Sequence, residues 1–406
     1  MQKSEPMENT VIAIFGNRNA GKSSLINSLT GQQTAIVSDV PGTTTDPVRK
    51  RIELPGIGIC TLVDTAGLDD GGGILGEERV AKSRLAAEQA DMAILVFAGG
   101  EVPDELADMA SHLKEMETPF VIVHNKCDIK RLSAQESCRA ASRLASDSAP
   151  LEYSCLAETA TGRDTLLDSL RSLAERNNND GERPVFEGLV KSGDTVVLVC
   201  PIDSEAPRGR LILPEVQAIR EILDRNATAV VLQPSELESY IVSHGKSISM
   251  VVTDSQVFPA VDKAVPEEIP LTSFSMLLAR SKGAFDAYKE GLLKLDSLND
   301  GDRILMLESC SHHATCEDIG RVKIPAMIRK YSGKTLDFDF VSGLDAIEGD
   351  IRRYAMVIQC GGCVVTRRQL LNRISKAVKA GIPVANYGMA IAWMTGIYKR
   401  VIKPLL

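Results

Sequence analysis

The stretch Gly16-Asn-Arg-Asn-Ala-Gly-Lys-Ser23 decides the fold of the first part of the chain. It fits the pattern G-x-x-x-x-G-K-S/T, directly after an apolar run, Val11–Phe15, and directly before a helical pattern, Ser23–Leu29. In such a strand–loop–helix unit, glycines let backbone N–H groups approach an anion, and the helix N-terminus presents further unpaired donors. The stretch therefore predicts a site for the phosphates of a nucleotide.

The polar residues of this loop have separate expected roles. Lys22 is expected to pair with the β- and γ-phosphates, and Ser23 is expected to ligate Mg²⁺. The other loop residues expected to contact the nucleotide are Gly16, Asn17, Asn19, Ala20, Gly21 and Ser24.

Further strand candidates at Ile59–Val63, Ala93–Phe97 and Phe120–Val123 alternate with helical stretches. This alternation predicts a parallel sheet covered by helices on both faces, which is an α/β fold. Asp64-Thr-Ala-Gly67 directly follows the first of these candidates. Asp64 is therefore placed to hold the magnesium shell, and the Gly67 amide to sense the γ-phosphate.

A base-specific motif, Asn125-Lys126-Cys-Asp128, follows Phe120–Val123. A carboxylate such as that of Asp128 accepts hydrogen bonds from both N1–H and the exocyclic amine of guanine, and adenine offers the wrong edge. Ser154-Cys155-Leu156 stands where a loop supporting the base is expected. The first unit is therefore predicted to bind GTP.

Two positions bear on hydrolysis. Thr44 is the best candidate for the switch threonine that closes on Mg²⁺, although Thr43 and Thr45 are neighbours able to take its place. Leu68 stands where many GTPases carry a glutamine that orients the attacking water, and leucine has no hydrogen-bonding group. Intrinsic hydrolysis is therefore expected to be slow. The residues expected to act at the γ-phosphate are Lys22, Thr44, Asp64 and Gly67.

Composition excludes several classes of protein. With 44% hydrophobic and 25% charged residues, the 406-residue chain has a globular composition, which excludes a disordered, coiled-coil or collagen-like chain. The net charge of −8 argues against a general nucleic-acid or membrane binder. No apolar run reaches membrane-spanning length, and the N-terminus lacks the pattern of a secretory signal, so a cytoplasmic protein is expected.

Three domains are expected from the distribution of strands and linkers. The first covers residues 1–178 and ends at a polar linker, Arg176–Pro184. A second, motif-poor α/β unit covers residues 185–268, and a third α/β unit covers residues 272–406. The third unit is expected to open with one helix, Ser275–Ser297.

Four of the nine cysteines crowd into the third unit. Cys310-Ser-His312 follows the strand candidate Arg303–Leu307, and Cys360-Gly-Gly-Cys363 follows Tyr354–Ile358. Carboxyl ends of strands are where open α/β sheets place ligands. Three thiolates there fit a [4Fe–4S] cluster with one open iron, or zinc with His312 or Cys316 as fourth ligand. A redox pair of Cys360 and Cys363, or coincidental thiols, are the alternatives.

Two resemblances follow from these residues. Asn19 in the phosphate loop, together with apolar Leu68, resembles the potassium-activated GTPases related to the tRNA-modification GTPases. That resemblance implies that Asn19 helps to hold K⁺ against the phosphates. The whole chain, with its GTP-binding unit, middle unit and Cys-x-His…Cys-x-x-Cys unit, resembles the HydF family of [FeFe]-hydrogenase maturation GTPases.

The second resemblance implies a scaffold or carrier. Such a homodimer holds a [4Fe–4S] cluster through Cys310, Cys360 and Cys363, receives a di-iron precursor made with radical-SAM maturases, and delivers it to apo-[FeFe]-hydrogenase. Gln359 departs from the family pattern, which commonly has histidine there, so the fourth ligand stays open. An RNA- or ribosome-associated GTPase with structural zinc is the alternative. The acidic balance counts against it.

Overall fold

The structure is a computed structural model that describes residues 10–30, 48–69, 74–156, 162–179, 183–202, 211–309 and 319–406. The chain forms two compact units, residues 1–180 and residues 181–406. Thr44, Cys310, His312 and Cys316 lie outside the described residues. Every helix in the described ranges is too short or too polar to cross a bilayer.

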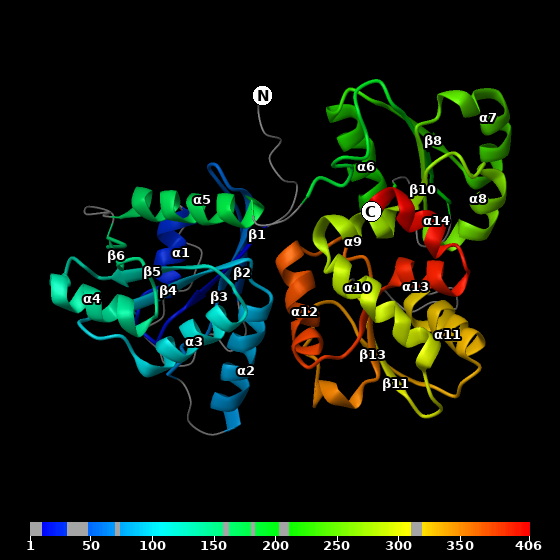
Figure 1. Ribbon diagram of the computed structural model, residues 1–406. Coiled ribbons are helices and arrows are strands. Elements are labelled where there is room, and N and C mark those ends of the chain that lie inside the picture. The colour runs from blue at the N-terminus through cyan, green and yellow to red at the C-terminus, as the bar shows by residue number, and fades with distance from the viewer. Residues whose placement is uncertain are drawn as a thin grey trace. The chain divides into compact units, whose positions relative to one another are not determined.

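The first unit is built on a six-stranded sheet in the order β2-β3-β1-β4-β5-β6. All neighbouring strands are parallel except β2, which runs antiparallel to β3 (Figure 1). The elements are β1 (Thr10–Phe15), α1 (Lys22–Thr30), β2 (Val48–Leu54), β3 (Gly58–Asp64), α2 (Ile74–Glu88), β4 (Met92–Ala98), α3 (Asp104–Glu115), β5 (Phe120–Asn125), α4 (Ala134–Arg143), β6 (Leu151–Tyr153) and α5 (Arg163–Asn179).

Central strands of this sheet are apolar on both sides because helices cover both faces. Along β1, Ile12 and Ile14 pack into one hydrophobic cluster with residues of α1 and α5. The alternate residues Ala13 and Phe15 pack into a second cluster with residues of α3. The burial of both sets fixes β1 at the centre of the sheet, and the phosphate loop therefore starts at its middle.

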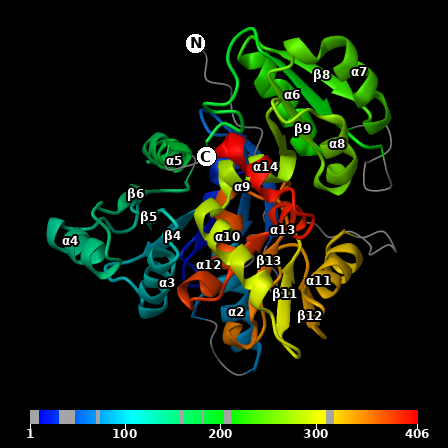
Figure 2. The same ribbon diagram turned by 45° about the vertical axis from the view of Figure 1, so that its right-hand side comes forward.

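The second unit begins with a four-stranded parallel sheet in the order β10-β9-β7-β8. Figures 1 and 2 show α6 on one side of this sheet and α7 and α8 on the other. The elements are β7 (Thr195–Val199), α6 (Leu213–Asp224), β8 (Thr228–Leu232), α7 (Leu237–His244), β9 (Met250–Thr253), α8 (Phe258–Ala264), β10 (Leu271–Ser273) and α9 (Phe274–Lys282).

A third parallel sheet has the order β12-β11-β13-β14. Read from β14, its strands follow the order fourth, third, first, second along the chain, as those of the second sheet do when read from β10. One hydrophobic core runs from Phe186 to Leu405 and joins it to the second sheet. The elements are α10 (Phe285–Gly291), β11 (Arg303–Leu307), α11 (Ile324–Ser332), β12 (Asp337–Val341), β13 (Met356–Gln359), α12 (Arg367–Lys379), β14 (Val384–Asn386), α13 (Tyr387–Met394) and α14 (Tyr398–Ile402).

The order of the third sheet reverses between β11 and β13. Connections leave β11 toward β12 in one direction and leave β13 toward β14 in the other. Because such crossovers are right-handed, their helices α11 and α12 lie on opposite faces, as Figures 1 and 2 show. The carboxyl ends of β11 and β13 therefore flank the point of strand-order reversal, where open sheets bind ligands.

The α/β class predicted from the sequence, with a phosphate-loop sheet first and two further α/β units, is confirmed. Strand β10 pairs with β9, so the second sheet includes residues 271–273. One detail differs. The helix expected over Ser275–Ser297 is divided into α9, α10 and a 3₁₀ turn, because the chain breaks at Gly283, where a Cβ would lie 2.7 Å from the Ala279 carbonyl oxygen.

Candidate nucleotide and cysteine sites

The phosphate loop follows β1 and is held around the side chain of Lys22, the first residue of α1. Lys22 Nζ donates hydrogen bonds to the carbonyl oxygens of Gly16 at 2.8 Å and Asn17 at 3.1 Å. The side chain is buried, with 8% of its surface exposed. The ammonium group is thus held inside the curve of the loop, where it is aimed at an anion bound by the loop.

Both glycines of the motif stand where a side chain does not fit. A Cβ on Gly16 would lie 2.2 Å from the carbonyl oxygen of Val96. Gly21 has φ of +91°, and a Cβ there would lie 2.2 Å from Asn125 Nδ2. Asn19 also has a left-handed backbone, with φ of 58°. The loop path therefore requires backbone conformations that glycine adopts without strain and that asparagine tolerates.

Ser23 and Asp64 form the core of the expected magnesium site. Ser23 Oγ donates to Asp64 Oδ2 at 2.6 Å. Asp64 Oδ1 is buried and has no hydrogen-bond partner among the described residues. Burial raises the pKa of Asp64, against the opposing effects of the Ser23 hydrogen bond and of Lys22 and Lys50. A buried carboxylate oxygen without a donor, beside a serine hydroxyl, fits a divalent cation with oxygen ligands.

The turn after Asp64 lies against the phosphate loop. Leu68 N–H donates to the Gly16 carbonyl oxygen at 3.3 Å, and Arg18 N–H donates to Asp69 Oδ1 at 2.6 Å. A Cβ on Gly67 would lie 2.5 Å from Arg18 Cγ. The Leu68 side chain is 7% exposed and packs in the core cluster that contains Phe15. Its isobutyl group therefore fills the core and offers nothing to an attacking water.

The base-specific motif is tied to both neighbouring loops. Asn125 Nδ2 donates to the Ala20 carbonyl oxygen at 2.9 Å, and Asn125 Oδ1 accepts from Cys155 Sγ at 3.4 Å. Ser154 Oγ donates to Asp128 Oδ1 at 2.7 Å. Burial raises the pKa of the Cys155 thiol to about 11. The thiol therefore stays protonated and can donate its S–H to Asn125. The structure therefore brings together the loop at 16–23, the motif at 125–128 and the segment 154–155.

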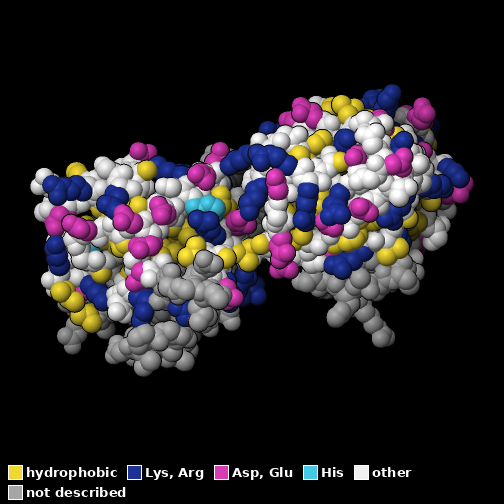
Figure 3. Space-filling view, turned by 90° about the horizontal axis from the view of Figure 1, so that it is seen from below, with side chains coloured by type: hydrophobic (Ala, Val, Ile, Leu, Met, Phe, Trp, Pro, Cys, Tyr) yellow, Lys and Arg dark blue, Asp and Glu magenta, His cyan; other side chains and the backbone are white. Residues whose placement is uncertain are grey.

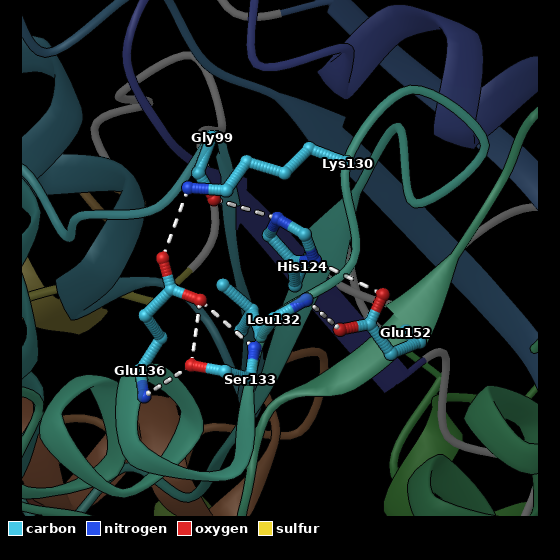
Figure 4. A network of polar contacts seen from close by, with 7 residues as sticks. All are labelled: Gly99, His124, Lys130, Leu132, Ser133, Glu136 and Glu152. Carbon is cyan, nitrogen blue, oxygen red and sulfur yellow. Dashed lines mark hydrogen bonds and ion pairs between the residues drawn. The ribbon is translucent and has the colours of Figure 1, made fainter.

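A polar network beneath this site was not predicted from the sequence (Figure 4). His124 is fully buried on β5, where Nε2 lies 2.8 Å from the Gly99 carbonyl oxygen and Nδ1 lies 3.1 Å from Glu152 Oε2. Glu152 Oε1 accepts from Leu132 N–H at 3.1 Å. The network joins the ends of β4, β5 and β6. His124 directly precedes Asn125, so the network supports the base-specific motif.

In the third sheet, Cys360 and Cys363 lie in the loop that follows β13. The backbone N–H of Ser309, which follows β11, donates to Cys360 Sγ at 3.0 Å. Burial raises the pKa of the Cys360 thiol, against hydrogen bonds from Ser309 and from the Gly362 backbone. Gly362 has φ of +66°, which permits the tight turn between the two thiols. The described residues contain no group of three or more metal-ligand side chains, and Cys310 lies beyond them.

Gln359 occupies the position where the resembled family commonly has histidine. Its side chain is fully buried on β13. Oε1 accepts from the Tyr288 hydroxyl at 2.7 Å, and Nε2 donates to the Leu370 carbonyl oxygen at 3.0 Å. Successive side chains of a strand point to opposite faces, so Gln359 and Cys360 diverge. Both ends of the amide are engaged in the core, and Gln359 is therefore not available as a cluster ligand.

An ion pair brackets the segment that carries Cys310. Arg321, just after that segment, binds Glu308, just before it, through Nε and one terminal nitrogen at 2.8–3.1 Å. Ser342 Oγ donates to the same carboxylate at 2.7 Å. This pair could not be predicted from the sequence, because acidic and basic residues thirteen positions apart are common.

The fold and contacts of the first unit define a P-loop GTPase domain. Residues 11–126 match a family model described as 50S ribosome-binding GTPase. The tRNA modification GTPases MnmE of Acinetobacter baylyi and Xanthomonas oryzae pv. oryzae are 42% and 37% identical over 124 and 171 residues. These regions cover 30% and 41% of this chain, and 27% and 34% of the relatives. The chain thus spans about a third or less of the curated relatives that it matches.

The second unit matches two models of one family. Residues 185–283 match the hydrogen maturase F dimerization domain, and residues 286–404 match the hydrogen maturase F tetramerization domain. These two matches together cover more than half of the chain, which belongs to the hydrogen maturase F (HydF) family. The resemblance inferred from the sequence is thereby confirmed.

Solved structures similar to this chain are GTP-binding proteins. A crystal structure of an Aquifex aeolicus Era variant bound to GDP.AlF4- is 24% identical, covers 41% of this chain and 57% of that chain, and has a TM-score of 0.36. A probable GTP-binding protein, engB, is 18% identical, covers 41% of this chain and 100% of that chain, and has a TM-score of 0.33.

Proposed function

We propose that this chain is a GTP-hydrolysing carrier that binds a [4Fe–4S] cluster through Cys310, Cys360 and Cys363 and delivers a di-iron precursor to apo-[FeFe]-hydrogenase. The observation that carries the proposal is the pair of thiols after β13, beside the strand-order reversal of a sheet that matches a hydrogen maturase F domain. The GTPase domain supplies a nucleotide-dependent element in the same chain. The two sites lie in separate units, which suits a switch for partner exchange better than direct participation in cluster chemistry.

In the nucleotide site, the Lys22 ammonium would balance negative charge on the γ-phosphate, and the Gly67 N–H would donate a hydrogen bond to it. Ser23 and Asp64 would hold Mg²⁺, with Thr44 as the third protein group, and the ion would supply further positive charge to the β- and γ-phosphate oxygens. The buried Leu68 leaves the attacking water without a side-chain partner at that position. Hydrolysis is therefore slow unless another positive charge acts at the phosphates.

Asn19 is proposed to help hold K⁺ against the phosphates. Asn19 is exposed in the phosphate loop and has a left-handed backbone. GTP turnover measured in KCl and in NaCl at equal ionic strength tests this role. Potassium stimulation that is lost in Asn19→Ala supports it, and equal rates in the two salts refute it.

The cysteine site suits a cluster because its surroundings stabilise a metal-bound thiolate. The Ser309 and Gly362 backbone groups direct hydrogen bonds to the Cys360 sulfur, although burial by itself disfavours a free thiolate. Three thiolates leave one iron of a [4Fe–4S] cluster without a cysteine, which is the position for an exchangeable ligand or for the cargo. Because Gln359 is engaged in the core, that ligand comes from elsewhere.

The chain is proposed to form a homodimer through the edge strand β8. An edge strand offers unpaired backbone groups to a second copy. Val231 on β8 is 42% exposed, and Val216 and Leu223 on the adjacent α6 are 39% and 56% exposed. Both dimerization and tetramerization domains are matched, so pairs of dimers are expected. The proposed partners are radical-SAM maturases and apo-[FeFe]-hydrogenase.

Anaerobic reconstitution with iron and sulfide, followed by EPR of the dithionite-reduced protein, tests the cluster. A [4Fe–4S] signal is expected in the wild type and should vanish when Cys310, Cys360 and Cys363 are all changed to Ser. Cys138→Ser, an exposed cysteine of α4, is the matched control and should keep the signal. Added imidazole that perturbs the signal would reveal the open iron.

The alternative function is an RNA- or ribosome-associated GTPase with structural zinc. Figure 3 shows basic and acidic side chains interspersed on the face that it draws of each unit, which is unlike the one-signed surface of a nucleic-acid binder. Stoichiometric zinc in place of a cluster, together with salt-sensitive RNA binding, would favour this alternative.

A further inference from the structure

The side chain of Arg373 on α12 reaches the carboxyl ends of two strands of the third sheet. One terminal nitrogen donates to the Glu308 carbonyl oxygen at 2.5 Å, and the other donates to the Val341 carbonyl oxygen at 3.1 Å. Its Nε is shielded from solvent and has no hydrogen-bond partner among the described residues. A guanidinium group held this firmly is a fixed charge at the mouth of the cysteine site.

Arg373 is linked to the sulfur of Cys360 through the peptide unit between Glu308 and Ser309. The Glu308 carbonyl and the Ser309 N–H belong to one peptide unit, and in a trans peptide they point in opposite directions. Arg373 donates to the oxygen of this unit, and the N–H of the same unit donates to Cys360 Sγ at 3.0 Å. Hydrogen bonds joined in this way polarise one another, so the guanidinium strengthens the N–H···S bond.

Arg373 makes no direct ion pair with a carboxylate of the described residues, although Asp345 and Glu308 lie near enough to stabilise its charge. The carboxylate of Glu308 is already engaged by Arg321 and Ser342. The two terminal nitrogens of Arg373 bind carbonyl oxygens. Burial lowers the pKa of Arg373, and Cys360, Tyr387, Asp345 and Glu308 oppose that effect. Arg373 therefore places a positive charge, bound to carbonyl oxygens, near the Cys360 sulfur.

We propose that Arg373 is a positioning residue for the cluster, which orients the Ser309 N–H onto the Cys360 sulfur and raises the reduction potential of the cluster. This inference rests on the proposed function. A [4Fe–4S]²⁺ core with three thiolates is already anionic, and reduction adds one more negative charge. A nearby buried cation favours the reduced form, and hydrogen bonds to cluster sulfurs act in the same direction.

The test is a redox titration of the reconstituted full-length chain, followed by EPR. Arg373→Gln removes the charge and should shift the potential to a more negative value. Arg373→Lys keeps the charge, so its potential should lie close to that of the wild type. Arg352→Gln is the matched control, because it removes an arginine charge from an exposed site in the same sheet domain, and it should leave the potential unchanged.

The potentials and cluster contents of the variants distinguish an electrostatic role of Arg373 from a purely structural one. An Arg373→Gln potential equal to that of the wild type overturns the inference, as does a lysine variant shifted as far as the glutamine variant. If the glutamine variant holds no cluster, a cluster restored by lysine supports the charge role, and loss in both variants shows a merely structural one. A wild-type chain that takes up no cluster overturns the proposed function, and this inference with it.

Discussion

In the first sheet, the phosphate loop follows β1, between β3 and β4, and in the third sheet the cysteine-bearing segments follow the neighbouring strands β11 and β13. Both sites therefore use the carboxyl ends of parallel strands near a reversal of strand order. In the first sheet, the site is closed by bonds between its own functional groups, such as Ser23 with Asp64 and Asn125 with Ala20. In the third, supporting bonds come from residues outside the thiol motif, such as Ser309.

This difference is the one expected if the first site binds a nucleotide and the second binds the proposed cluster. A nucleotide is recognised by many weak donors and acceptors, which must be preorganised relative to one another. A metal cluster supplies strong bonds of its own, so the protein needs thiols at the right strand ends and a polar surrounding that suits bound sulfur. The first site should therefore be sensitive to changes within its motifs, and the second to changes around them.

Asp128→Asn should produce the largest effect and tests the preorganised site directly. An asparagine amide cannot accept from both N–H groups of guanine, so GTP affinity should fall roughly 100- to 1,000-fold. Xanthosine triphosphate has a carbonyl in place of the amine, so it should bind the variant better than GTP does. Nucleotide affinities measured by calorimetry check both points. Asp147→Asn, at an exposed position of the same unit, should change neither affinity.

Gly21→Ala should come next. The substitution imposes a strained backbone and drives a methyl group into Asn125 Nδ2, which breaks the link between the phosphate loop and the base motif. We expect a loss of about 2–3 kcal/mol in the free energy of unfolding of the first unit, together with weak GTP binding.

A matched control for this change is Gly58→Ala. Gly58 has φ of +90° but open space around the position of a Cβ, so only backbone strain of about 1 kcal/mol is expected. Denaturant titrations of both variants separate strain from the clash. Equal losses in the two variants would show that the contact with Asn125 contributes nothing.

Gln359→Leu tests whether the Gln359 side chain stabilises the core beside the thiol pair or binds the cluster. The change leaves the fully buried Tyr288 hydroxyl without its acceptor and should cost about 1–3 kcal/mol, while the cluster EPR signal is retained. Adding Tyr288→Phe should recover about 1 kcal/mol, since both partners are then apolar. Loss of the cluster with an unchanged free energy of unfolding would instead make Gln359 a ligand.

Asp64→Asn should have the smallest effect on stability. The raised pKa of Asp64 means that its ionised form disfavours the Mg²⁺-free fold, so the associated stability is present at low pH and lost as pH rises through the folded-state pKa. At pH 7 the variant should be about 1 kcal/mol more stable in the absence of Mg²⁺, and the gain should vanish in acid. A gain that persists when Asp64 is protonated would contradict this account.

The nucleotide-site residues and the strand–loop–helix unit could be predicted because each motif is contiguous and follows an apolar strand. Strand β2 was not predicted, since its first half carries three consecutive basic residues, Arg49–Arg51, on an edge strand. Arg373 and the His124–Glu152 pair were also missed. Their partners lie 65 and 28 residues away, and only the folded sheet brings them together. Gln359 was recognised as a departure, but its engagement with Tyr288 required the structure.

The ion pair between Glu308 and Arg321 has a consequence for how the cysteine site assembles. It joins residues thirteen positions apart, on either side of the segment that contains Cys310. Closing a chain of that length costs about 2 kcal/mol of entropy. The ion pair offsets part of this cost in the metal-free fold, so under the proposed function less of that entropy is left for cluster binding to overcome.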